Sequence, residues 1–263
     1  MTNQMRYRGN LYGKFTGPGT VTGKPTAAIW DEFPLDRAND FDVAGFSALY
    51  DGNDLSTKVQ DWILTADTTT EAQAGSDTQT NTLTVDAADN KFGGISLVND
   101  RATASTTSGL LCFEARFHCD TAAIAAGKLS IFAGLIDGAP ALANPQADGG
   151  ATITAKSVGF FKDAAATTAV DAVSFGGAQE DVKLGAATLA ASTFIQLGLK
   201  LDPVNQVMRY FVNGTELSET SALSGANFPN DVNLRPAIVA ASATTSSPGV
   251  ITIDWIRVGQ INP

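Results

Sequence analysis

The stretch that decides the fold is LCFEARFHCDTAAIAAGKLSIFAGLID, residues 111–137. At its start two sets of side chains alternate, the first being Leu111, Phe113, Ala115, Phe117 and Cys119 and the second Cys112, Glu114, Arg116 and His118. A two-residue period places successive side chains on opposite faces of a β-strand. The pattern therefore predicts a strand over residues 110–119, with one face in the core and the other partly in water.

A second strand is predicted over residues 128–137 (KLSIFAGLID). The small-residue connector 121–127 is the only stretch where a helical turn is expected. Elsewhere helix is scarce, because short β-branched or aromatic runs alternate with turn residues about every ten positions.

Further along the chain, residues 194–212 predict a meander of two strands. Residues 194–201 alternate apolar and polar side chains, turn at Asp202-Pro203-Val204-Asn205, and continue as residues 206–212. Asn213-Gly214 then supplies the dipeptide of two-residue hairpin turns, because both positions tolerate a positive φ. A last strand over residues 250–258 is expected to close the domain by pairing beside an early strand.

The remaining segments carry weaker signals. Residues 65–81 and 139–155 are rich in Thr, Ala, Gly, Asp and Gln and predict loops or weak edge strands. The Ala-Thr run at residues 164–168 is interpreted as part of a tightly packed sheet rather than a helix. Together these patterns predict an all-β protein, a sandwich of two antiparallel sheets.

Charge divides the chain into two expected parts. An extended, glycine-rich arm covers residues 1–29, and a β-sandwich domain covers residues 30–263. Residues 1–30 hold no acid and four basic residues, namely Arg6, Arg8, Lys14 and Lys24. The rest carries 13 basic and 27 acidic side chains, a balance of −14 within a total of −10. The four arm residues are the candidate contacts to a larger assembly, although an ordinary mobile terminus explains them equally well.

Composition excludes several classes of function. Cys112 and Cys119 lie about 23 Å apart along one strand at about 3.3 Å per residue, so they cannot form a disulfide with each other. A single histidine, His118, removes most triads and histidine metal sites, and is expected at a strand end on the surface. The acidic balance disfavours nucleic acid and anionic membranes as partners. No signal peptide or membrane span is recognised at the sequence level, which predicts a protein that is made and kept in a cytoplasm, or released by lysis.

Three segments in order resemble the concanavalin A-like lectin/glucanase jelly roll: residues 111–137, residues 193–216 (TFIQLGLKLDPVNQVMRYFVNGTE) and residues 234–258 (LRPAIVAASATTSSPGVITIDWIRV). The shared features are a FEAR strand followed by one ending in GL-D, an LGLK strand before an F-V-N-G hairpin, and the final IDWIRV strand. The resemblance covers roughly residues 90–260 and implies a jelly-roll fold.

The same segments, with Phe160-Phe161 in a central strand and the loop 227–231 before Leu234, also resemble structural proteins of tailed bacteriophages. Some of these use the jelly roll as a head decoration or cement subunit. That resemblance implies a place on the capsid exterior, with the major capsid protein as partner.

No catalytic motif is recognised, and no cofactor is expected. Glycosidases of this fold resemble one another in an E-x-D-x-x-E strand that this sequence lacks. The nearest acids are assigned to loops or isolated positions: Asp163, Asp171, Glu180 and Asp181. Glu114 and Arg116 are expected to pair on the surface. The segment 51–54, and Asp36 with Asp40 and Asp42, offer oxygen ligands for calcium, but solvated turns explain them better, so no metal site is assigned.

The leading hypothesis is a capsid decoration or cement protein of the virion, forming a homo-dimer or homo-trimer. The alternative is a carbohydrate-binding module of a phage tail or fibre. It would need exposed aromatics, for which Trp30, Tyr50, Trp62, Phe160 and Phe161 are candidates, although burial is expected for most of them. Trp255, in the closing strand, is expected to be structural.

Overall fold

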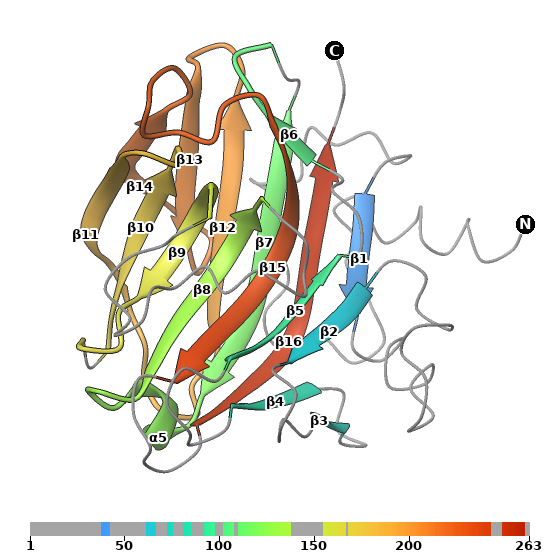
Figure 1. Ribbon diagram of the computed structural model, residues 1–263, viewed down its shortest axis with the longest axis vertical. Coiled ribbons are helices and arrows are strands. Elements are labelled where there is room, and N and C mark those ends of the chain that lie inside the picture. The colour runs from blue at the N-terminus through green and yellow to red at the C-terminus, as the bar shows by residue number, and fades with distance from the viewer. Residues whose placement is uncertain are drawn as a thin grey trace, which may run out of the picture.

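Two antiparallel β-sheets lie face to face in the computed structural model of the protein (Figure 1). The structure describes residues 38–42, 62–66, 73–75, 81–85, 92–97, 102–107, 110–137, 155–166, 168–242 and 249–260. The strands of sheet A are, in spatial order, β14 (Thr215–Ala222), β13 (Val207–Val212), β12 (Ile195–Asp202), β7 (Leu111–Cys119), β16 (Gly249–Gln260), β4 (Asn81–Val85) and β3 (Gln73–Gly75), with β1 (Ala38–Asp42) also on β16. The strands of sheet B are β11 (Glu180–Thr188), β10 (Ala169–Phe175), β9 (Ser157–Lys162), β8 (Leu129–Ile136), β15 (Val232–Ser242), β5 (Phe92–Leu97) and β2 (Trp62–Ala66), with β6 (Ala102–Ala104) also on β15. The predicted two-sheet sandwich is confirmed.

The deciding stretch forms β7 and β8 as predicted, joined by the short helix α5 (Thr121–Ile124). Asp120 caps this helix, because its side chain accepts a hydrogen bond of 2.6 Å from the backbone N–H of Ala123. The chain thus turns from sheet A into sheet B within one helical turn. The connector was the one place where the sequence indicated helix, and that prediction is confirmed.

The expectation that the second face of β7 is partly wet is wrong. Cys112 and Glu114 are fully buried and Arg116 is 9% exposed. The reason is the position of the strand: β7 lies between β12 and β16, so side chains from both neighbours flank its outer face. Periodicity identifies the two faces of a strand but does not reveal whether the strand is central.

The meander is confirmed as β12 and β13, and the Asn213-Gly214 turn leads into β14. Asn213 and Gly214 have φ values of 49° and 79°, the two positive values that a type I′ turn requires. The Asn213 side chain also accepts a 3.0 Å hydrogen bond from the backbone N–H of Gln196. The turn therefore fixes the start of β12 as well as the hairpin.

β16 joins distant parts of the chain, which confirms the predicted pairing beside an early strand. One edge of β16 pairs with β7 over most of its length. Its other edge pairs first with β4 and then with β1. Sheet A is consequently continuous only when this strand is in place.

The structure also assigns the segments whose sequence patterns were weaker. Residues 73–75 form an edge strand, as expected for the segment 65–81. Residues 163–166 form a turn and β10 begins at Ala169, so the described part of the Ala-Thr run lies in neither a helix nor a strand, and the interpretation of the run as part of a sheet is wrong. β11 has no counterpart in the predictions, and β14 was indicated only by the hairpin turn that precedes it, because both are edge strands whose side chains are mostly exposed or half-buried on both faces.

The core lies between the sheets and takes alternate side chains from each strand. Phe113, Phe117, Phe160 and Tyr210 are all at most 1% exposed there. Burying one such aromatic contributes roughly 2–3 kcal/mol to the free energy of unfolding. The Tyr210 hydroxyl, 2.8 Å from Ser221 Oγ, also contacts the carbonyl of Val173 in sheet B at 3.3 Å. This polar contact ties the two layers together inside an apolar interior.

The boundary between the arm and the domain remains a prediction. Arg6, Arg8, Lys14 and Lys24 lie outside the described residues. Within the ranges given above, no helix is long and apolar enough to cross a membrane.

Candidate functional site

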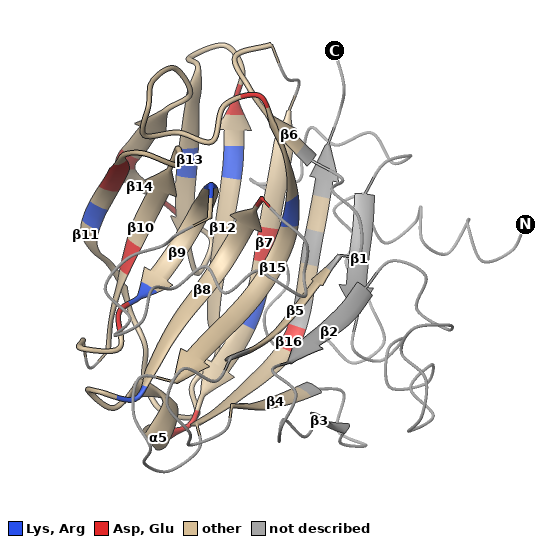
Figure 2. Ribbon diagram, in the orientation of Figure 1, with Lys and Arg blue, Asp and Glu red and all other residues tan. Residues whose placement is uncertain are grey.

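Charged side chains gather on the outer face of sheet A, the face turned away from sheet B. Figure 2 shows bands of charge on β7, β12 and β13. These side chains alternate with the core residues of the same strands: on β12, for example, Lys200 and Asp202 alternate with Leu199 and Leu201. The alternation that fills the core therefore also assembles this polar face.

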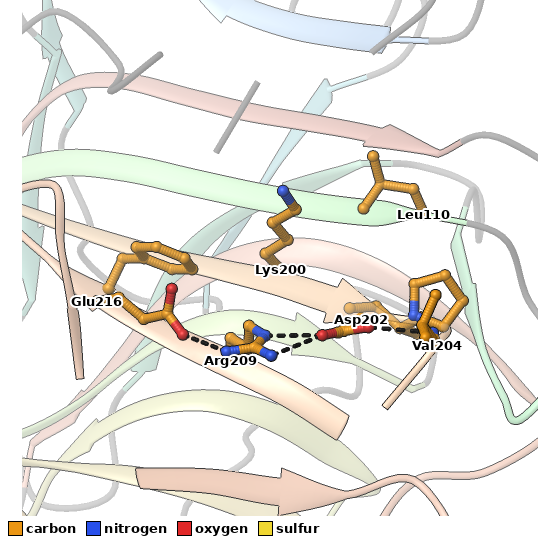
Figure 3. Close-up of a pocket in the computed structure, with 9 residues that line it drawn as sticks. Leu110, Lys200, Asp202, Val204, Arg209 and Glu216 are labelled. Carbon is orange, nitrogen blue, oxygen red and sulfur yellow. Dashed lines mark hydrogen bonds and ion pairs between the residues drawn. The ribbon is translucent and has the colours of Figure 1, made fainter. Parts of the chain in front are cut away.

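A pocket of about 370 Å³ opens at one end of this face (Figure 3). It is lined by Leu110, Lys200, Leu201, Asp202, Pro203, Val204, Arg209, Phe211 and Glu216. These residues come from β12, β13, β14, the turn between β12 and β13, and the residue before β7. We call it the Arg209 pocket. Its volume falls within the range of small-molecule sites, which is about 300–1,000 Å³.

Arg209 lies between two carboxylates in this pocket. Its Nε and Nη2 donate to Asp202 Oδ2 at 3.0 and 2.7 Å, and its Nη1 donates to Glu216. The hydrogen bonds fix the plane of the guanidinium and raise the pKa of Arg209 above its ordinary value. The result is a rigid polar surface built from three strands.

Asp202 is held ionised by the turn that follows it. Partial burial raises the pKa of this carboxyl, but hydrogen bonds from Asn205 and Arg209 outweigh that effect and hold the pKa well below its usual range. Two of these bonds come from Asn205, through its backbone N–H at 3.0 Å and its side-chain amide at 2.7 Å. Asp202 therefore acts as a hydrogen-bond acceptor near neutral pH and does not supply the proton that a general acid must donate.

The Arg209 pocket combines this polar surface with apolar walls. The Phe211 ring and Pro203 line it, and Val204 at its mouth is 87% exposed. An apolar surface beside fixed donors and acceptors suits a ligand with one apolar face and several hydroxyl groups, such as a pyranose ring. Sequence reasoning did not single out Lys200, Asp202, Arg209 or Glu216. The sequence did carry one signal for this site. Asp202 and Arg209 lie on either side of a predicted turn between two strands, so their side chains could have been expected to meet.

A second polar cluster lies nearer the centre of sheet A. Arg116 pairs with Asp254 on β16 and stacks over the Phe194 ring, with 3.9 Å from its guanidinium carbon to the ring centroid. The Gln196 amide donates to Glu114. The expected surface pair between Glu114 and Arg116 is therefore wrong, because each residue binds a side chain of a neighbouring strand and Glu114 is fully buried.

His118 lies near the end of β7, as expected, but not on the open surface. It is half-buried, and its ring packs edge-on against Phe194 with 4.6 Å between the ring centroids. Burial lowers the pKa of His118 below its ordinary value, so the ring is neutral at physiological pH. It belongs to the packing of this cluster rather than to the exposed surface.

The outer face of sheet B carries a different chemistry. It holds a second apolar cluster, made of Phe132, Ile136, Phe161, Val173, Ala237 and Val239, all of them buried. Gly134 and Gly159 face each other beneath it. A Cβ on either glycine would lie 2.9 Å from the tip of the Phe132 ring, so the pair lets the ring lie flat on the sheet. Apolar side chains occupy the middle of this face.

The four acids singled out from the sequence do not form one group. Asp163 lies in the turn after β9, whereas Asp171 is in β10, and Glu180 and Asp181 are in β11. The expectation of loops or isolated positions allows both placements. Asp171 accepts a 2.7 Å hydrogen bond from the backbone of Gly185. Asp181 binds Lys183 at 2.8 Å and accepts a hydrogen bond from Ser221. These are strand contacts at the edge of the sandwich.

The other candidates fall partly outside the described residues. Trp30, Tyr50, Asp36 and the segment 51–54 lie outside them, and of β1, Trp62 and Trp255 only the backbone is described. Phe160 and Phe161 are buried, as expected. Cys112 and Cys119 form no disulfide with each other, as expected, and both are buried. Over the described ranges no three His, Cys, Asp or Glu side chains are grouped to hold a metal ion.

No protein-family model and no curated protein matches the sequence. Solved structures do match. The endo-β-1,4-glucuronan lyase of the fungus Trichoderma reesei has a TM-score of 0.56 at 9% identity, over 86% of this chain and 96% of the lyase. The β-glucanase of Bacillus licheniformis has a TM-score of 0.54 at 11% identity, over 87% and 100%. Peanut lectin has a TM-score of 0.53 at 12% identity, over 87% and 100%.

The fold is the concanavalin A-like lectin/glucanase jelly roll. The resemblance seen in the sequence is confirmed to that extent. At such low identity the likeness concerns the fold alone. Because the concanavalin A-like neighbours include a lyase, a glucanase and a lectin, the fold is compatible with both enzymes and binding proteins. Function must be argued from the residues of this chain.

Proposed function

We propose that this concanavalin A-like protein is a structural protein of a bacteriophage virion, a non-enzymatic decoration or cement subunit on the capsid exterior. Its partner is the major capsid protein, and it is synthesised in the host cytoplasm. The observation that carries the proposal is the division of charge, with +4 in residues 1–30 and −14 in the remainder. A basic segment that the sequence predicts to be extended, on an acidic body, suits attachment across subunit boundaries, since it would add contact area beyond the domain itself.

The two outer faces support a binding role. On sheet B the middle of the face is occupied by the Phe132 cluster, which offers no acid to a substrate. On sheet A, Arg116 and Arg209 are each engaged by carboxylates of neighbouring strands. Such satisfied contacts stabilise a rigid scaffold, which is what a reinforcing subunit requires.

The test uses heads assembled without this protein. The full chain with Arg6, Arg8, Lys14 and Lys24 all changed to Gln is compared with wild type for occupancy on purified heads, at several salt concentrations. We expect occupancy to fall markedly in the variant, and wild-type binding to weaken as salt rises, because exposed charges are screened. The matched control, with Lys14 and Lys24 changed to Arg, keeps the charge and should bind normally.

Two outcomes would reject this role of the arm. One is equal occupancy of the neutralised variant and wild type. The other is failure of wild-type protein to attach to heads at all. Electron microscopy of decorated particles then places the bound protein on the head exterior or elsewhere.

A carbohydrate-binding module of a tail or fibre is a second candidate, favoured by the Arg209 pocket. Its fixed guanidinium and carboxylates, beside the Phe211 ring, offer the mixed surface that a sugar ring needs. A glycan array followed by calorimetry tests it. We expect Arg209→Ala to weaken binding of any glycan that wild type binds by about tenfold or more, because the ligand would lose charge-assisted hydrogen bonds.

The control for that experiment is Glu219→Gln, on the same strand as Glu216 but outside the pocket. It should bind as wild type does. Equal affinity of Arg209→Ala and wild type would show that the pocket is not the glycan site. Absence of binding across the array would dismiss this candidate.

A further inference from the structure

We propose that Asn213 is a site of spontaneous chemical modification in this protein. Its side-chain amide closes onto the backbone nitrogen of Gly214 and is converted to aspartate or isoaspartate, and the folded hairpin sets the rate. The inference concerns the chain itself and does not depend on what the protein attaches to.

The sequence supplies the reacting pair once, because Asn213-Gly214 is its single Asn-Gly dipeptide. Glycine has no Cβ to hinder the approach of its nitrogen to the asparagine side chain. The Gly214 nitrogen gives up its proton and bonds to Asn213 Cγ, while the side-chain nitrogen takes up a proton and leaves as ammonia. Water then opens the succinimide at one of its two carbonyls. One opening gives aspartate and the other gives isoaspartate, so the overall change is hydrolysis of an amide to an acid.

The place of this pair in the fold gives water access to it. Asn213 and Gly214 form the tip of the hairpin between β13 and β14, and the pair that closes this turn is Val212 with Thr215. Asn213 and Thr215 are both exposed. The central residues of a two-residue turn lie beyond the closing pair, so the Gly214 nitrogen is outside the ladder of the two strands.

The folded turn nevertheless keeps the reacting atoms apart. The φ values of 49° at Asn213 and 79° at Gly214 are those of a type I′ turn. Ring closure needs the Gly214 nitrogen to eclipse Asn213 Cβ about the Cα–C bond, which is not the conformation of this turn. The Asn213 side chain is also held toward β12, where its oxygen accepts a 3.0 Å hydrogen bond from the backbone N–H of Gln196. The reaction therefore requires the turn to open locally.

The two products differ in what they do to the hairpin. Aspartate tolerates a positive φ and keeps an acceptor for the Gln196 N–H. Isoaspartate lengthens the main chain of the turn by one CH₂ group, so the closing pair can no longer keep its register. It also displaces the acceptor from Gln196, whose side chain donates to the buried Glu114 of β7. Isoaspartate alone therefore weakens the attachment of β12 to its neighbours.

The first test follows conversion in the full chain at mildly alkaline pH, in buffer and in concentrated urea. Peptide mapping by mass spectrometry locates each converted residue. We expect Asn213 to convert before any other asparagine in urea, and at least about tenfold more slowly in buffer, because only the opened turn reacts. Asn213→Asp is the matched control and should show no mass gain in this peptide. Equal rates in the two solutions, or another asparagine converting first in urea, would overturn the proposal.

Amide hydrogen exchange tests whether the turn controls the rate. The N–H of Gln196 is bonded to Asn213, so its exchange reports the same opening. Raising urea in steps below the unfolding transition should speed exchange at Gln196 and conversion at Asn213 by the same factor. Exchange that accelerates while conversion stays constant would show that the turn does not control the reaction.

The last test compares the two products, which have the same mass and the same charge. Protein enriched in isoaspartate by incubation is separated by chromatography and unfolded in urea beside Asn213→Asp. We expect Asn213→Asp to unfold at the wild-type midpoint and the isoaspartate form to unfold at a lower urea concentration. Circular dichroism verifies that both forms are folded at the start. A common midpoint for the two forms would contradict the role assigned to the Asn213 turn.

Discussion

Lys162 occupies an unusual place for a lysine, since it is only 1% exposed at the end of β9. Its ammonium donates to three backbone carbonyls: Leu129 at 2.8 Å, Asp163 at 3.1 Å and Ala166 at 3.0 Å. These bonds join the turn after β9 to the start of β8. Burial nevertheless lowers the pKa of Lys162 to about 8, because the charged form loses its hydration.

The lowered pKa of Lys162 predicts how stability changes with pH. Between about pH 8 and its ordinary value of 10.5, the unfolded chain holds a proton that the folded chain has released. The free energy of unfolding should therefore rise with pH across this window, by up to about 3 kcal/mol from this group. Lys162→Met should remove that rise, measured by urea unfolding at several pH values.

Lys162 and Lys162→Met should be compared in proteins that both carry Cys119→Ala. Burial raises the pKa of the neighbouring Cys119 thiol to about 12, so that thiol affects the same pH range with the opposite sign. Tyr210, whose pKa burial also raises, is common to both proteins and cancels in the difference. Identical pH profiles with and without Lys162 would contradict the prediction.

Single residues also show which contacts the sequence could not predict. The pattern placed Glu114 and Arg116 correctly on one face of a strand but could not find their partners. Asp254, which pairs with Arg116, is 138 positions away in the sequence. Such a partner depends on which strands are neighbours in the sheet, and local periodicity carries no information about that order.

At the scale of elements, the Asn213-Gly214 turn offers a clean test of a predicted hairpin. Gly214→Ala should lower the free energy of unfolding by about 1 kcal/mol, because φ of 79° strains a residue that has a Cβ. Asn213→Asp is the control, since aspartate tolerates a positive φ and keeps an acceptor for the Gln196 N–H. An unfolding midpoint unchanged by Gly214→Ala would mean that the turn has another conformation.

Elements were predictable where their two faces differ. β7, β12 and β13 each combine core residues with a second, more polar or packed face and were found by their alternation, whereas β8 was predicted as a run of strand-forming residues after the connector. β11 was not found and β14 was indicated only by its hairpin turn, because edge strands with exposed side chains on both faces have no apolar period to detect. The Arg209 pocket was missed for the same reason, since β14 supplies one of its walls.

For the whole molecule, the order of segments in the sequence indicated the jelly roll, and similar solved structures share it. The distribution of charge between the two sheet faces was not predictable in this way. It depends on how β12, β7 and β16 lie side by side, which brings together residues from widely separated segments. Fold class follows from local patterns, whereas a site follows from strand order.

β16 follows every other described strand in the sequence, and this order affects how the chain folds during translation. β7 pairs with β12 on one side but needs β16 on the other, where Phe113 meets Val258. All strands from β8 to β15 leave the ribosome between these two partners. The hairpins of sheet B can form while synthesis continues, but β7 waits with an open edge until β16 emerges. Translation speed and chaperone supply, more than the intrinsic strength of the finished core, should therefore control how much protein reaches the native state.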